Sequence, residues 1–164
     1  TACAYSLAGG HAEPTTNAPF GCANGKLEQV SGQGDFTASI GGGFAAAGGG
    51  TVSLACTLSS PTPPAVGATW TLSKSAHSQG NCQLNVVQGT TATLWGASAN
   101  DATLSGALML TFTNVTMVHG TAHPTDVYYL YDLTLTATLP GLSAGATDVT
   151  VVGSFKNLSL PLGS

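Results

Sequence analysis

Apolar and polar residues alternate along much of this chain, and this two-residue period is typical of β-strands that bury one face. The longest alternating run covers residues 127–139, in which Val127 and every second residue up to Leu139 are apolar or aromatic. Asp132 lies among the intervening, mostly polar residues, where we expect it to be exposed to solvent. The run is longer than a usual strand, so we expect a bend or bulge within it.

Other alternating runs predict further strands, at residues 51–58, 69–73, 82–86, 104–112, 149–155 and 157–162. Glycine clusters, prolines and short polar segments separate these runs. No segment carries the 3.6-residue apolar stripe of a helix over three turns. The pattern predicts an all-β fold, namely an antiparallel β-sandwich or jelly roll of about eight to ten strands, with a flattened barrel as the alternative.

A chain of 164 residues is most simply one domain, here residues 1–164. Residues 1–25 are rich in glycine and proline and predict an irregular N-terminal arm. We expect a disulfide to tether this arm to the rest of the domain.

The chain has four cysteines, which are Cys3, Cys22, Cys56 and Cys82. An even number in a composition typical of exported proteins suggests two disulfides, for which three pairings exist. We favour Cys3–Cys22 and Cys56–Cys82, because these close short loops and each would stabilise the fold by roughly 3 kcal/mol. Cys56 and Cys82 are in phase with core residues, so we expect their disulfide to lie inside the sandwich.

Charged residues are scarce. The chain has no arginine, its lysines are Lys26, Lys74 and Lys156, and only 6% of its residues are charged, against about a quarter in an average soluble protein. This argues against a nucleic-acid partner, which needs several basic residues for phosphate contacts, and against an anionic membrane surface. No apolar run reaches the ~20 residues that span a bilayer.

The composition, the cysteines and the start Thr1-Ala2-Cys3, which is typical of a processed N-terminus, predict a secreted protein of the extracellular space or cell surface. Lipidation of Cys3 is the alternative interpretation of this start.

Three short segments carry a resemblance to a known group of proteins. They are Thr69-Trp70-Thr71-Leu72, Leu135-Thr136-Ala137-Thr138-Leu139-Pro140 and Val149-Thr150-Val151. The chain resembles, through these segments, secreted or lipoprotein-like all-β domains predicted in Gram-negative bacteria such as myxobacteria. Such domains have no assigned role, so the resemblance implies export and a β fold only.

Two histidines and an acid form the weak candidate for a metal site. His119 and His123 are four residues apart and Asp126 follows, a set that could bind Zn²⁺ or Cu²⁺. Gly120 and Pro124 exclude a helix that would align the imidazoles, so a polar turn between two strands is the simpler interpretation. We therefore predict no metal and no cofactor.

The sequence carries no catalytic signature. The Gly-x-Ser-x-Gly motif of hydrolases is missing, no pair of carboxylates stands out for glycoside hydrolysis, and the glycine clusters lack the Lys-Ser/Thr ending of a phosphate loop. We predict that the protein is not an enzyme.

The aromatic residues suggest a binding surface. Trp70, Tyr129 and Tyr131 are in phase with the core, which leaves Trp95, Tyr128 and Tyr5 to contact a ligand such as a sugar ring. Two sequons, at Asn114 and Asn157, could accept N-glycans in a host with that machinery.

We predict an extracellular structural or surface-assembly protein without catalytic activity. Edge strands without charged residues favour pairing with copies of the same chain, through edge strands or termini. The alternative is a carbohydrate-binding module whose partner is a polysaccharide.

Overall fold

The computed structural model describes residues 2–9, 19–20, 26–29, 36–45, 50–71, 80–98, 107–123 and 125–160. Their regular elements are strands: β1 (Ala2–Gly9), β2 (Pro19–Phe20), β3 (Lys26–Gln29), β4 (Phe36–Ala45), β5 (Thr51–Ser60), β6 (Thr69–Thr71), β7 (Gly80–Gln88), β8 (Thr91–Ser98), β9 (Ala107–His119), β10 (Val127–Leu139) and β11 (Val149–Leu160). The described part thus has eleven strands, slightly more than expected. The count includes β2 and β6, which are only two and three residues long.

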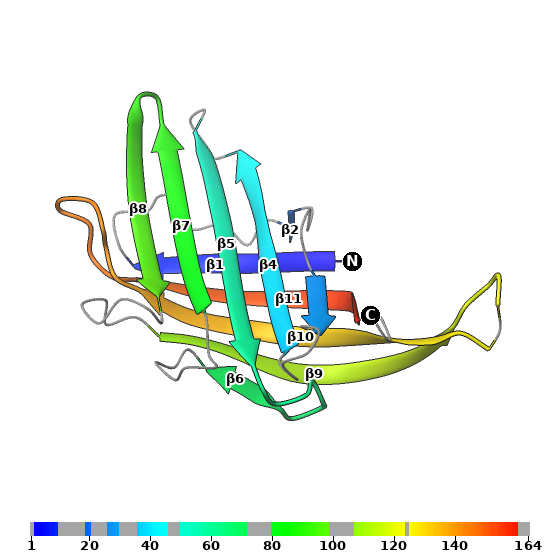
Figure 1. Cartoon of the computed structure of the whole chain (residues 1–164). Coiled ribbons are helices and arrows are strands. Elements are labelled where there is room, and N and C mark those ends of the chain that lie inside the picture. The colour runs from blue at the N-terminus through cyan, green and yellow to red at the C-terminus, as the bar shows by residue number, and fades with distance from the viewer. Residues whose placement is uncertain are drawn as a thin grey trace.

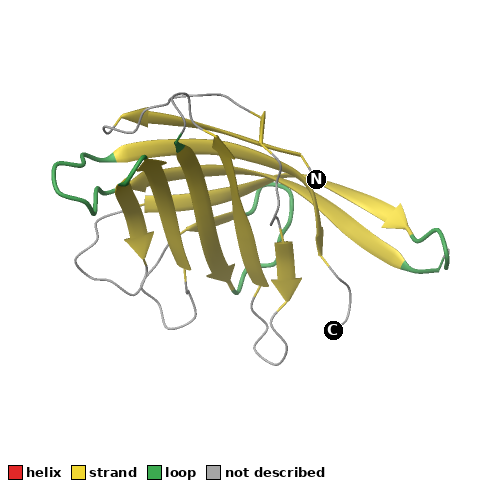
Figure 2. Cartoon of the chain, turned by 90° about the horizontal axis from the view of Figure 1, so that it is seen from above, coloured by secondary structure: helices red, strands yellow, loops and turns green. Residues whose placement is uncertain are grey.

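The strands form two antiparallel sheets that face each other (Figure 1). One has the order β2-β1-β11-β10-β9-β6, and the other has the order β3-β4-β5-β7-β8. The strands of the second sheet run steeply across those of the first in both views (Figure 1, Figure 2), as in orthogonally packed sandwiches. The predicted all-β antiparallel sandwich is confirmed.

The core lies between the sheets and follows the alternation of the sequence. Exposed and buried residues alternate along β5 from Thr51, and Tyr131 and every second residue up to Leu139 are buried in β10. An edge-to-face aromatic contact joins Trp70 to Phe112, with ring centroids 4.9 Å apart. Each fully buried large apolar side chain contributes about 1.5–3 kcal/mol to folding.

The pairing of the long strand β10 is irregular, but the bulge expected within β10 is not found there, because the extra residues belong to its neighbours β9 and β11. The pairing with β9 shifts between Asp132 and Leu133, and the pairing with β11 shifts between Tyr131 and Leu133. The Asn157 N–H donates to Asp132 Oδ1 at 3.0 Å. Asp132 is therefore half-buried rather than fully exposed, and its carboxylate holds the bulge in β11, where Asn157 has a φ of 61°.

The expectation of an irregular arm over residues 1–25 is wrong for residues 2–9. These residues form β1 and pair antiparallel with β11, from Ala2 opposite Lys156 to Gly9 opposite Val149. The alternation of Cys3, Tyr5 and Leu7 with small residues suits a strand, and pairing with β11 satisfies its backbone groups. Residues 10–18 and 21–25 lie outside the described residues.

Candidate functional site

The hairpin of β9 and β10 extends past the five-stranded sheet and projects from the body of the sandwich (Figure 1, Figure 2). We call residues 113–123 and 125–131 the hairpin arm. Both strands of the hairpin are thirteen residues long. Tyr131 belongs to the core, and Val115 and Tyr129 pack against it, so the base of the arm is covered and its far end passes beyond the second layer (Figure 1). The sequence pattern alone does not reveal this projection, because apolar residues continue along both strands.

The hairpin arm carries apolar side chains on both faces. Val115 lies opposite Tyr131 and Met117 lies opposite Tyr129, on the face turned to the core. Val118 lies opposite Tyr128 on the other face. Met117 is 55% exposed and Tyr128 36% exposed, so the arm presents apolar surface of the kind found at contacts between proteins.

Among the described strands, the outer edge of β9 has a neighbour only in its first half. β6 pairs with Met109–Thr111, and Phe112 exchanges hydrogen bonds with Gly67 and Ala68. Beyond Phe112, no strand of the described residues pairs with this edge.

The backbone of this edge is directed away from β10 at alternate residues. The Gly120 N–H donates to the Asp126 carbonyl at 2.8 Å. Because antiparallel strands alternate between residues that bond to one neighbour and to the other, Thr116 and Val118 bond to β10. Val115 and Met117 therefore direct their N–H and C=O groups outward.

The edge strand β8 of the five-stranded sheet is covered. Residues after β10 lie along β8, where the Gly96 N–H donates to the Pro140 carbonyl and the Leu142 N–H donates to the Leu94 carbonyl. The Leu94 N–H donates to Ser143 Oγ at 3.0 Å. The segment closes one side of the sandwich and prevents pairing at β8.

Trp95 does not form a ligand platform, and the expectation that it contacts a ligand is wrong. Its side chain is 0% exposed, and its Nε1–H donates to the Thr147 carbonyl at 2.8 Å. Strand β8 continues through Gly96 to Ser98, and Trp95 points into the core. Tyr128 is exposed as expected. The Tyr5 side chain lies outside the described residues.

The predicted metal candidates lie in the turn at the tip of the hairpin arm. His119, His123 and Asp126 are all exposed. The Asp126 N–H donates to the His123 carbonyl at 2.9 Å, which helps to close the turn. In the part of the chain that the structure describes, no group of three or more acidic, histidine or cysteine residues is arranged to hold a metal ion.

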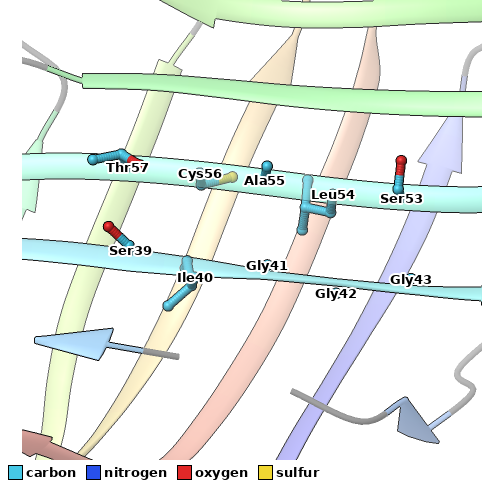
Figure 3. Close-up of a pocket in the computed structure, with 10 residues that line it drawn as sticks. All are labelled: Ser39, Ile40, Gly41, Gly42, Gly43, Ser53, Leu54, Ala55, Cys56 and Thr57. Atoms are coloured by element: carbon cyan, nitrogen blue, oxygen red, sulfur yellow. The ribbon is translucent and has the colours of Figure 1, made fainter. Parts of the chain in front are cut away.

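A shallow depression of about 410 Å³ lies over β4 and β5 (Figure 3). Gly41, Gly42 and Gly43 line it together with Ser and Thr residues, and no charged side chain contributes. A Cβ at Gly41 would lie 2.7 Å from the Leu54 carbonyl oxygen, so this glycine permits the close approach of the two strands. The depression offers hydroxyl groups but no acid or base for catalysis.

The disulfide predicted between Cys56 and Cys82 is present. The two cysteines lie directly opposite each other on β5 and β7, and both are buried. Cys22, and with it the proposed Cys3–Cys22 pair, lies outside the described residues. The sequon residues Asn114 and Asn157 are exposed on either side of Asp132.

Burial, with a smaller contribution from Tyr129, raises the pKa of Tyr131. The Tyr131 hydroxyl therefore stays neutral at physiological pH, so this residue brings no charge to the base of the hairpin arm.

Among the described residues, no helix has the length and apolar character needed to cross a bilayer. Comparison of the chain with protein-family models, curated proteins and solved structures gives no match.

Proposed function

We propose that this protein is a non-catalytic structural subunit of the extracellular space or cell surface that assembles with copies of itself. The observation that carries the proposal is the hairpin arm, which combines exposed apolar side chains with an open strand edge. Soluble proteins normally protect such edges with lysine, proline or a covering segment. No lysine, arginine or proline lies in β9.

The extracellular setting is supported by the Cys56–Cys82 disulfide, since disulfides persist in oxidising compartments. The low content of charged residues also suits assembly, because neighbouring copies repel each other weakly.

Light scattering on the purified, oxidised protein over a wide concentration range tests this proposal. We expect the mean mass to rise above that of the 16.2 kDa chain as the concentration rises. A Met117→Ser, Tyr128→Ser double variant should show a smaller rise, because it removes apolar surface from both faces of the hairpin arm. A wild-type protein that stays monomeric at millimolar concentration contradicts the proposal.

Binding of a polysaccharide is the second candidate, supported by the uncharged depression over β4 and β5. Uncharged hydroxyl groups suit hydrogen bonding to a sugar chain. Glycan-array binding that is lost when Ala55→Leu fills the depression would support this role. Binding that is unchanged by the substitution would exclude the depression as the site.

A further inference from the structure

We propose that the partner of the open β9 edge is the same edge of a second copy, paired antiparallel about a two-fold axis at Thr116. This inference rests on the proposed assembly function and specifies its contact. The two six-stranded sheets would then join into one continuous sheet through β9 and its copy.

The outward-directed residues set the register. The stretch without a neighbouring strand among the described residues begins at residue 113, after the last contact with the loop before β6. Val115 and Met117 direct their backbone groups outward in this stretch. A pairing that uses both residues of each copy is centred between them, at Thr116.

The hydrogen-bonding groups agree with this register. Pairing about Thr116 places Val115 opposite Met117 of the second copy, and both residues direct their N–H and C=O groups outward. Antiparallel strands need such matched pairs of outward residues. A shift of the register by one residue would place the outward N–H and C=O groups of one copy opposite residues of the other copy whose backbone groups already bond to β10.

The side chains agree as well. Val115 and Met117 lie on the same face of the sheet, so each would pack against the other across the axis, twice in a dimer. An isologous contact of this kind closes on itself. Like charges directly opposite each other destabilise strand pairs. No charged residue lies between Thr113 and Val118, so this pairing brings no like charges together.

The projection of the hairpin arm makes this edge accessible. The arm extends away from the second sheet (Figure 1), so two arms can lie side by side with the two sandwiches at opposite ends. So short a paired segment buries less than the roughly 1,600 Å² of a standard interface. We therefore expect a reversible, concentration-dependent contact.

Cross-linking with a Thr116→Cys variant tests the register directly. In the proposed pairing, Thr116 faces its own copy in a non-hydrogen-bonded pair, where Cα atoms lie about 4.5 Å apart. We expect mild oxidation to convert this variant to a covalent dimer. Val152→Cys is the matched control, because Val152 is 49% exposed but belongs to β11, which is enclosed by β1 and β10. Dimer yields that are equal for the two variants overturn the inference.

Sedimentation equilibrium of a Met117→Lys variant gives an independent readout. Lysine on an edge opposes strand addition, and we expect the dissociation constant to rise about tenfold or more. Val152→Lys, with similar exposure but no free edge, should leave it unchanged. Equal effects of the two substitutions overturn the inference.

The two proposals fail in different ways. A wild-type protein that assembles but shows no preference for cross-linking at Thr116 refutes the β9 contact and leaves assembly through another surface. A wild-type protein that is monomeric at every concentration refutes both.

Discussion

The two tryptophans of the core offer a matched test of the structure. Trp70 and Trp95 are 1% and 0% exposed, and replacing either by phenylalanine removes the same atoms from the interior. Their indole nitrogens differ, however. Trp95 Nε1–H donates to the Thr147 carbonyl at 2.8 Å, whereas Trp70 Nε1 is buried and has no hydrogen-bond partner among the residues that the structure describes.

The expected difference in stability follows from these contacts. Trp95→Phe loses a hydrogen bond whose net contribution is about 1 kcal/mol. Trp70→Phe removes an unsatisfied donor whose burial costs about 1–3 kcal/mol, and it keeps a ring beside Phe112. Since the apolar and cavity terms largely cancel in the comparison, Trp95→Phe should be the less stable variant by about 2 kcal/mol or more.

Urea unfolding with the Cys56–Cys82 disulfide intact, followed by circular dichroism, measures this difference without relying on tryptophan fluorescence. The slopes of the two transitions should agree, because similar surface is exposed on unfolding. A Trp70→Phe variant that is as unstable as Trp95→Phe, or less stable, refutes the assignment of the two indole environments.

Three further predictions concern the backbone and the disulfide. Asn157→Ala should lower the free energy of unfolding in urea by about 1 kcal/mol, because alanine avoids the positive φ of 61°. Asn157→Gly should lower it by less, and equal losses for the two variants would contradict the bulge. A Cys56→Ala, Cys82→Ala double variant should lose about 3.5 kcal/mol for the 26-residue separation, and an unchanged unfolding midpoint would contradict the disulfide. Gly41→Ala should destabilise by about 1–3 kcal/mol, and more than Gly43→Ala, because its Cβ would lie 2.7 Å rather than 3.0 Å from a backbone oxygen; the reverse order would contradict the strand approach.

Much of the fold could be predicted because alternation reports directly which face of a strand is buried. The buried faces of β5 and the second half of β10 follow from it, as does the Cys56–Cys82 pair, whose residues lie in phase with the core. The length of β10 indicated an irregularity, but the extra residues lie in its neighbours β9 and β11. The role of Asp132 did not, since an acid on a polar face gives no sign that a backbone N–H from another strand will reach it.

The wrong predictions concern features that depend on how distant segments of the chain pack together. Trp95 was expected to contact a ligand, yet β8 continues past it and the segment after β10 bonds to the edge of β8, so Trp95 is buried. Glycine and proline after residue 9 obscured strand β1, which is eight residues long. The projecting hairpin arm could not be foreseen, because its exposure depends on how far β9 and β10 extend past the other sheet.

Amide hydrogen exchange along β9 tests the central claim most directly. The N–H groups of Thr116 and Val118 bond to β10 and should be protected at every protein concentration. Those of Val115 and Met117 point outward and should exchange fast in dilute protein and slowly in concentrated protein, as a second copy pairs with the edge. Fast exchange at Val115 and Met117 at all concentrations would contradict the account.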